Sequence, residues 1–181
     1  MKIEKTKLEG VLKIIPDIFQ DDRGYFFESF NEKKYWEYGI PNDFVQDNIS
    51  KSKKFTVRGL HYQVGKFAQG KLCEVLSGEV LDVAVDLRKN SPTFGRYASA
   101  VLSEKNHHQL WIPVGFAHGF SVLSDEAIFH YKCTQFYSKE HECSLYYADK
   151  DLKINWENPE PILSEKDLNA PKFKDIGDKL F

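Results

Sequence analysis

A histidine flanked by cationic side chains is the first feature of the sequence that could perform chemistry. His61 lies in the run Gly59-Leu-His-Tyr-Gln63, with Arg58 directly before it and Lys71 further along the chain. An imidazole has a pKa near neutrality, so His61 is a candidate general base. A guanidinium and an ammonium beside it would attract an anionic ligand. A hydrogen-bonded core histidine is the ordinary alternative, and the two cations favour a site instead.

Strand alternation decides which of these side chains can share a cavity. In a regular strand His61 and Gln63 point to the same face as Gly59, whereas Arg58 points to the other face. If Arg58 and His61 both enter one cavity, the strand must be bulged or bent. Gly59 is the natural position for such a bulge, because glycine tolerates the backbone that bulges need.

A tyrosine in a later run is a candidate proton donor. In Ile128–Thr134 the side chains of Phe129, Tyr131 and Cys133 share one face of a predicted strand. A tyrosine that faces a cavity opposite a histidine could deliver a proton. A buried tyrosine with a structural, hydrogen-bonded hydroxyl is the commoner case.

The histidines also raise the question of a metal. His61 and the run Pro113–His118 are similar to motifs of the metal-binding cupins, which hold a cation with a His-x-His pair, a glutamate and a further histidine. Transition metals need three or four converging donors. Here Gln63 replaces the second histidine of the pair, and Glu74 is only a displaced candidate. We therefore expect no functional metal.

Many short strands would position these residues. Alternating or apolar runs predict strands over 24–30, 44–49, 55–63, 70–76, 79–88, 96–102, 109–112, 119–123, 127–137 and 145–148. Such spacing, without strand–helix alternation, indicates an all-β antiparallel sandwich or barrel such as a jelly roll. Helix is expected only near Glu32–Tyr38 and over Ser164–Leu168, with Ser164 as the N-cap.

Two local patterns give more specific expectations. The turn signal Ser77-Gly78 predicts a β-hairpin between the runs on either side of it. In the second run the odd positions from Leu81 to Leu87 are aliphatic and the even ones are mixed, which predicts a half-buried strand or the wall of a polar-lined cavity. The pair His107-His108 lies in a polar stretch, and we expect it to be exposed.

Length and composition limit the class of protein. The 181 residues fit one domain, with a barrel core over about 13–150 and a C-terminal extension over about 151–181. A net charge of −2 disfavours a nucleic-acid or membrane-surface binder. A charged N-terminal stretch, three unpatterned cysteines and no long apolar run predict a cytoplasmic protein with reduced thiols. The 26 aromatic residues could fill a core or line a pocket.

Nine segments in order, between about Lys13 and Pro171, resemble the dTDP-4-dehydrorhamnose 3,5-epimerase family. They are Asp22–Phe30, Phe44–Ser52, Arg58–Gln63, Gln69–Leu72, Asp82–Arg88, Ser91–Gly95, Leu110–Phe120, Tyr131–Thr134 and Leu163–Asp167. The resemblance implies a cupin-type double-stranded β-helix, or jelly roll, that forms a homodimer. It also implies inversion of C3 and C5 of dTDP-4-dehydro-6-deoxy-D-glucose to give dTDP-4-dehydro-L-rhamnose in dTDP-L-rhamnose biosynthesis, with no cofactor.

The resemblance also implies a role for each matched residue. By similarity His61 is the base, Asp167 orients it, Tyr131 is the acid, and Lys71 stabilises negative charge on the C4 oxygen. The positions that match nucleotide-sugar-binding residues are Arg23, Glu28, Gln46, Asp47, Asn48, Arg58, Lys71, His118, Tyr137, Glu142 and Lys166. Tyr137 matches a position that stacks on the nucleotide. In the family some of these residues come from the neighbouring subunit.

Other functions stay open at this point. A non-catalytic nucleotide-sugar-binding module would have no reason to keep His61, Asp167, Tyr131 and Lys71 together. A metal-dependent cupin oxygenase or isomerase would need a bound metal. Relatives with the same base and acid act at C3 only, at C5 only or on GDP-linked sugars, so the specificity of the reaction is also open.

Overall fold

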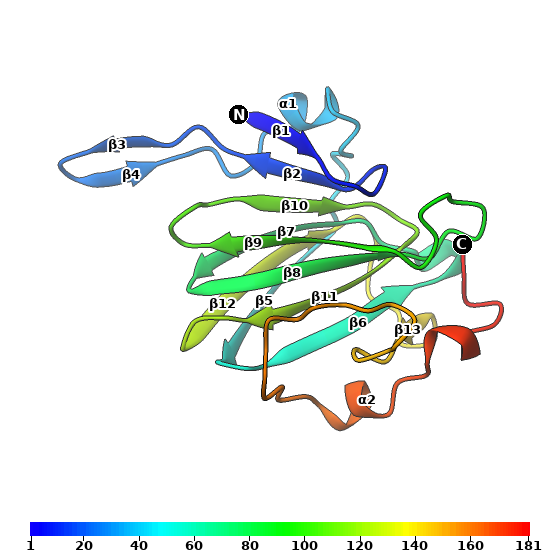
Figure 1. Ribbon diagram of the computed structural model, residues 1–181. Coiled ribbons are helices and arrows are strands. Elements are labelled where there is room, and N and C mark those ends of the chain that lie inside the picture. The colour runs from blue at the N-terminus through cyan, green and yellow to red at the C-terminus, as the bar shows by residue number, and fades with distance from the viewer.

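The computed structural model describes residues 1–181, most of whose regular structure is short strands (Figure 1). The strands are β1 (Lys2–Lys5), β2 (Leu12–Ile15), β3 (Phe19–Asp21), β4 (Gly24–Phe26), β5 (Gln46–Lys53), β6 (Val57–Gln63), β7 (Lys71–Ser77), β8 (Glu79–Asp86), β9 (Tyr97–Ser103), β10 (Gln109–Ile112), β11 (Phe116–Val122), β12 (Glu126–Cys133) and β13 (Glu142–Ser144). The helices are α1 (Glu32–Trp36) and α2 (Glu165–Leu168), with short 3-10 turns over Gly65–Phe67 and Phe173–Asp175.

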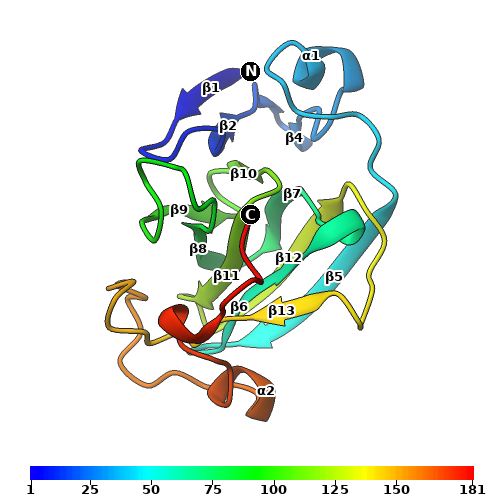
Figure 2. The same cartoon turned by 90° about the vertical axis from the view of Figure 1, so that its right-hand side faces the viewer.

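Two antiparallel sheets form the body of the molecule. The six-stranded sheet has the order β1-β2-β10-β7-β12-β5, and the five-stranded sheet has the order β13-β6-β11-β8-β9. In Figure 2 the strands of both sheets surround a common interior. Apart from the consecutive pairs β1–β2 and β8–β9, neighbouring strands in each sheet are distant in sequence, as in a jelly roll. The predicted all-β jelly roll is confirmed, and no helix of the structure has the length and apolar character to cross a membrane.

The predicted hairpin at Ser77-Gly78 is wrong. Strand β7 pairs with β10 and β12, whereas β8 pairs with β9 and β11 in the other sheet. Gly78 has a φ of +82°, and a Cβ atom there would lie 2.1 Å from the carbonyl oxygen of Glu126. The turn signal therefore marks a reversal that carries the chain from one sheet to the other, which only glycine can make here.

The ends of the chain also differ in part from the expected pattern. Strands β1 and β2, which the sequence pattern does not predict, form an edge of the six-stranded sheet. The prediction of a strand over 145–148 is wrong, because the last strand, β13, begins three residues earlier and ends at Ser144. The predicted cap of α2 is confirmed: the Ser164 hydroxyl accepts a hydrogen bond from the backbone N–H of Asp167.

Strand β8 is buried on both faces rather than on one. Its Val80 and Ala84 side chains belong to the apolar cluster between the sheets. Val83 and Val85 belong to a second cluster, which also contains Trp156 from the C-terminal segment. Each fully buried valine side chain of this strand contributes about 1.5–3 kcal/mol. The C-terminal segment therefore covers the outer face of the sheet that carries β6 and β8.

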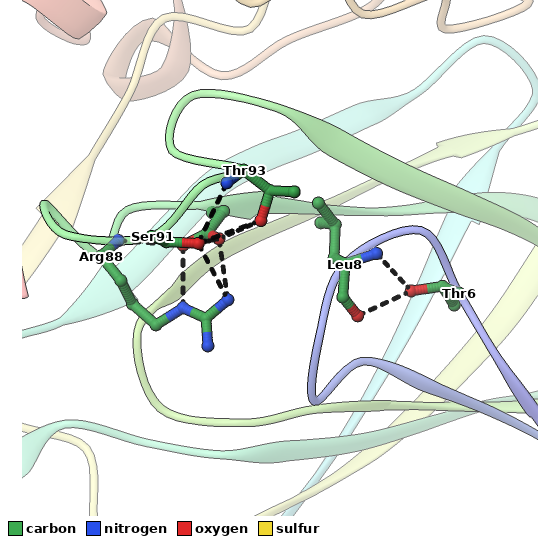
Figure 3. Close-up of polar contacts among 6 residues, drawn as sticks. Thr6, Leu8, Arg88, Ser91 and Thr93 are labelled. Carbon is green, nitrogen blue, oxygen red and sulfur yellow. Dashed lines mark hydrogen bonds and ion pairs between the residues drawn. The ribbon is translucent and has the colours of Figure 1, made fainter.

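A buried carboxylate fixes the loop between β8 and β9. Asp86 is fully buried and accepts hydrogen bonds from Arg88 Nε (2.9 Å), Ser91 Oγ (2.6 Å) and Thr93 Oγ1 (2.7 Å). Figure 3 shows Arg88, Ser91 and Thr93 gathered at this point. Burial alone would raise the pKa of Asp86, but the donors, Arg88 foremost, outweigh it and hold the pKa at about 2.

Strands β3 and β4 form a separate hairpin, which we call the arm, that extends away from the sheets (Figure 1). Two aromatic side chains on the arm, Phe19 and Phe26, are 65% and 70% exposed. The prediction that His107 is exposed is wrong. Its ring is buried and lies 4.5 Å from that of Tyr25 and 4.7 Å from that of Phe27, at the base of the arm.

Candidate active site

His61 is held by a carboxylate from the C-terminal helix. Its Nε2 atom lies 2.6 Å from Oδ1 of Asp167, whose side chain is 3% exposed. Burial alone would raise the pKa of Asp167, but the hydrogen bond and charge of His61 outweigh it and hold that pKa below its usual value. With Asp167 ionised, Nε2 carries the hydrogen and Nδ1 keeps the lone pair of a general base.

The expected bulge lies at Gly59. His61 pairs with His118 of β11, but Arg58, three positions earlier, pairs with Phe120, only two positions later. The extra residue in β6 places Arg58 on the same face as His61. Gly59 has a φ of +124°, and a Cβ atom there would lie 2.6 Å from the Cα of Gly119. The charge of Arg58 lowers the pKa of Tyr131, although burial is the larger effect and raises that pKa.

Tyr131 approaches from the opposite sheet. It lies on β12 of the six-stranded sheet, whereas His61 lies on β6 of the five-stranded sheet. Burial raises the pKa of Tyr131 to about 12, so its hydroxyl stays protonated at neutral pH. The Lys71 Nζ atom lies 5.7 Å from the centre of the Tyr131 ring. A proton acceptor, a proton donor and a cation thus come from two facing sheets.

A cavity of about 260 Å³ joins these groups. Its lining residues are Gln46, Asn48, His61, Tyr62, Gln63, Gln69, Lys71, Tyr131, Cys133, Tyr137 and Glu142. Asp167 lies behind His61, and Lys166 forms an ion pair with Glu142. Burial alone would raise the pKa of Glu142, but this ion pair helps to hold it below its usual value. The cavity therefore combines cationic, anionic, amide and aromatic groups within one volume.

Six of the eleven predicted binding residues do not line this cavity: Arg23, Glu28, Asp47, Arg58, His118 and Lys166. Asp47 alternates with the inward-facing Gln46 and Asn48 on β5, so it points outward, where it forms an ion pair with Lys132. Arg23 lies on the arm, with 89% of its side chain exposed, and pairs with Asp21.

Glu28 follows the arm and binds Lys34 and Asn31 instead of the cavity. In a single chain, the side chains of Arg23, Glu28 and Asp47 therefore do not line the cavity that contains His61.

Three buried side chains offer donors for a metal ion. One ligand atom each of Cys73, Asp82 and His118 lies within 4.8 Å of the others. His118 Nε2 is 2.7 Å from Asp82 Oδ1 and 3.7 Å from Cys73 Sγ. Burial raises the pKa of Cys73 well above its usual value, which favours the neutral thiol, a poor metal ligand. The donor chemistry thus fits a buried His–carboxylate hydrogen bond better than a cation site.

A larger cavity, of about 740 Å³, lies elsewhere. It is bordered by the N-terminal segment Lys5–Leu12 and by Tyr38, Trp111 and Pro113. Neither His61 nor Tyr131 lines it, and its lining residues include no histidine. The smaller cavity is therefore the candidate active site, because the groups with acid–base chemistry converge there.

Four lining residues were absent from the predicted set: Tyr62, Gln63, Gln69 and Cys133. Alternation along the strands could have found two of them, since Gln63 shares a face with His61 and Cys133 shares one with Tyr131. Gln69 lies outside a strand, so no periodic pattern places it.

Comparison with known proteins gives one consistent family. A sequence profile described as dTDP-4-dehydrorhamnose 3,5-epimerase matches residues 5–175. The enzyme of that name from Shigella flexneri is 53% identical over 97% of both chains. A crystal structure of the Elizabethkingia anophelis enzyme of that name has a TM-score of 0.93 and 55% identity, and the match covers 97% of both chains.

A second solved structure contains a sugar nucleotide. It is the dTDP-6-deoxy-D-glucose-3,5-epimerase of Legionella pneumophila in complex with dTDP-4-keto-L-rhamnose. Its TM-score is 0.93 at 50% identity, and the match covers 97% of this chain and 94% of that one.

Proposed function

The chain belongs to the dTDP-4-dehydrorhamnose 3,5-epimerase family, and on that basis we propose how its residues invert C3 and C5 of dTDP-4-dehydro-6-deoxy-D-glucose. The product is dTDP-4-dehydro-L-rhamnose, a precursor of dTDP-L-rhamnose. One observation carries the assignment of roles: a base held by a buried carboxylate and a protonated tyrosine line one cavity from opposite sheets. Epimerisation needs this arrangement, because a proton leaves one face of the carbon and another arrives on the opposite face.

His61 removes the proton. The hydrogens on C3 and C5 are acidic because the C4 ketone stabilises the enolate that forms when either is lost. Nδ1 of His61 accepts the proton, and the ring becomes an imidazolium. Asp167, 2.6 Å from Nε2, stabilises that charge and keeps the ring in one orientation.

Tyr131 returns a proton on the opposite face. Its hydroxyl donates to the enolate carbon, and the C4 ketone forms again. A phenol that is protonated at neutral pH suits this step, since the pKa of Tyr131 is raised to about 12. His61 then releases its proton to solvent, which its partly exposed side chain permits, and Tyr131 regains one.

Lys71 stabilises the enolate. Lys71 lines the cavity from β7, where it pairs with Cys133 of β12. It therefore lies two residues along β7 from Cys73, the pairing partner of Tyr131. An ammonium aimed at the C4 oxygen lowers the energy of the negative charge that develops there. No electrons are lost or gained by the sugar, so the reaction calls for no redox cofactor, and we propose that it uses no metal.

Other residues that line or adjoin the cavity bind the nucleotide. Tyr137 presents an exposed ring, and its hydroxyl donates to Glu142 Oε2 at 3.2 Å. Lys166, paired with Glu142, supplies a positive charge for the diphosphate. Gln46 and Asn48 supply amide groups on the wall formed by β5. Arg58 and His118 add cationic and hydrogen-bonding groups beside Tyr131.

A homodimer would complete the site. The arm carries Arg23 and two exposed aromatic rings away from the cavity of its own chain. Exposed aromatic side chains next to a cation suit a thymine base and a diphosphate. We therefore propose that the arm of each subunit reaches the cavity of the partner, and that the dimer works in the cytoplasm, where nucleotide sugars are made.

Product analysis tests this function. Purified protein incubated with dTDP-4-dehydro-6-deoxy-D-glucose should yield a sugar whose proton NMR couplings show inversion at both C3 and C5. Inversion at C3 alone would assign a mono-epimerase instead. A bound but unchanged substrate would show a binding module.

A further inference from the structure

Gln63 is a buried amide at the end of the catalytic strand to which the proposed mechanism gives no role. It is 4% exposed and follows His61 by two positions on β6. Its partner across the five-stranded sheet is Glu142, one of the nucleotide-binding candidates. Gln63 thus lies between the residues proposed for catalysis and those proposed for nucleotide binding.

All three hydrogen bonds of Gln63 go to backbone atoms of neighbouring loops. Its Nε2 donates to the carbonyl oxygens of Phe67 (2.7 Å) and Phe136 (3.1 Å), and its Oε1 accepts from the N–H of Ser138 (2.7 Å). These partners fix the orientation of the amide, because the flipped amide would place its oxygen against two carbonyl oxygens.

The loop held in this way carries Tyr137. We call residues 134–138, which follow β12, the stacking loop. Gln46 Oε1 accepts from the N–H of Tyr137 at 2.8 Å, and Gln69 Nε2 donates to the carbonyl of Gln135 at 2.6 Å. Amides from three separate segments therefore hold consecutive peptide groups of the loop.

The ring of Tyr137 depends on this backbone for its position. Tyr137 is 53% exposed, and its only other polar tie is the hydroxyl contact to Glu142. An exposed ring with so few side-chain contacts is placed mainly by the peptide units on either side of it, and Gln63 binds both: the carbonyl of residue 136 and the N–H of residue 138.

We propose that Gln63 is a positioning residue for nucleotide recognition: it locks the stacking loop to the strand that carries His61, so that the ring of Tyr137 is preorganised to stack on the base. The inference rests on the proposed function, since it assumes that Tyr137 contacts the nucleotide. Preorganisation of a binding surface increases affinity because less freedom is lost when the ligand binds.

Glutamine is suited to this task for a chemical reason. Three bonds require two N–H donors and one acceptor from a single side chain. Glutamate has no donor and would face two carbonyl oxygens with a negative charge. Methionine has a similar shape but forms none of the bonds. Gln63→Met and Gln63→Glu therefore remove the lock in two different ways.

Kinetics and binding of these variants test the proposal. Gln63→Met should raise both the KM for dTDP-4-dehydro-6-deoxy-D-glucose and the Kd for dTDP measured by calorimetry about tenfold, while kcat changes by less than about threefold. Gln63→Glu should raise both at least as much. If Gln63→Met does not fold, Gln63→Glu and its Kd for dTDP decide the matter.

Gln109 provides a matched control. It is 2% exposed and also forms three hydrogen bonds, to Ser29, Glu74 and Tyr35, but it lies on β10, away from the cavity. Gln109→Met should lower the melting temperature about as much as Gln63→Met and leave KM and Kd unchanged. An equal rise of KM in both variants would show a general loss of packing and overturn the proposal.

A double-mutant cycle tests whether Gln63 acts through Tyr137. Tyr137→Ala should weaken dTDP binding, and adding Gln63→Met to it should cost little more, because the ring to be positioned is already gone. Additive losses, or wild-type KM and Kd in Gln63→Met, would overturn the inference. Absence of epimerisation by the wild-type protein with normal dTDP binding would instead reject the proposed function, while the binding measurements would still judge the role of Gln63.

Discussion

His61 Nε2 lies 2.6 Å from Asp167 Oδ1, although 106 positions separate the two residues in the chain. The C-terminal segment that delivers Asp167 also packs on the outer face of the sheet that carries His61. The His61–Asp167 contact is therefore complete only when this segment is packed on the sheet.

The His61–Asp167 contact predicts the effect of Asp167→Asn. An amide can donate to Nε2 and so stabilise the wrong tautomer, and it cannot offset the charge of an imidazolium. We expect kcat to fall about ten-thousandfold, the loss seen when the same change is made in a catalytic triad, with dTDP affinity within about threefold of wild type. Initial rates and calorimetry measure both. A kcat within about threefold of wild type would show that the carboxylate is not needed.

Tyr131→Phe should separate chemistry from binding. It removes one hydroxyl and keeps the ring that packs in the core, so reprotonation should slow by about 10² to 10⁴ while dTDP binding is retained. Because the pKa of Tyr131 is raised to about 12, its ionisation should not lower the wild-type rate between about pH 7 and pH 10. Equal rates of epimerisation by the two proteins would reject Tyr131 as the acid.

Asp86→Asn should destabilise the protein in a way that depends on pH. The folded pKa of Asp86, about 2, is below the usual 3.8 of the unfolded chain, so its ionisation contributes stability above about pH 4 that is lost as the pH falls toward 2. The difference corresponds to roughly 2 kcal/mol. Urea unfolding should therefore show a large difference in the free energy of unfolding between wild type and variant at about pH 7, and a smaller difference at about pH 3.

The matched control for Asp86 is Asp125→Asn. Asp125 forms an ion pair with Lys54, but its side chain is 95% exposed, so its removal should hardly change the unfolding free energy. A gap between wild type and Asp86→Asn that stays constant with pH would contradict the role assigned to the ionised Asp86.

Mixed dimers test whether the arm serves the partner. Arg23→Ala and His61→Ala should each inactivate the homodimer, one through the arm and the other through the cavity. In a co-expressed mixed dimer, the cavity of the Arg23→Ala subunit would meet the intact arm of its partner and form one wild-type site. About a quarter of wild-type activity should return, since half of the dimers are mixed and each has one working site. If no activity returned, the arm would not serve the cavity of the partner subunit.

Local features such as bulges and turns were easier to predict from the sequence than the pairing of strands within the sheets. The bulge at Gly59 was predicted on the condition that His61 and Arg58 enter one cavity, because the two cannot share a face of a strand without an extra residue. The turn at Ser77-Gly78 was also predicted, but the pairing partners of the strands on either side of it were not. A turn signal reports a reversal of the chain, whereas the sheet that each strand joins depends on contacts far away in sequence.

The candidate active site was likewise predicted in part from local sequence patterns. Alternation could place Tyr131 and Cys133 on one wall, but only the family resemblance connected Asp167 with His61, since no pattern links residues on different elements. The burial of His107 was missed because its cover comes from Tyr25 and Phe27, distant in sequence. The bonds of Gln63 were missed because its partners are backbone atoms, which carry no sequence signal.

We propose that His61 removes the protons at C3 and C5 and that different protons, drawn from solvent, arrive on the opposite face of each carbon. The decisive measurement is NMR of dTDP-4-dehydro-6-deoxy-D-glucose incubated with the protein in deuterium oxide. Wild type should incorporate deuterium at both C3 and C5 with inversion, and His61→Ala should incorporate none at either position. Exchange at both carbons by His61→Ala at the wild-type rate would rule out His61 as the base.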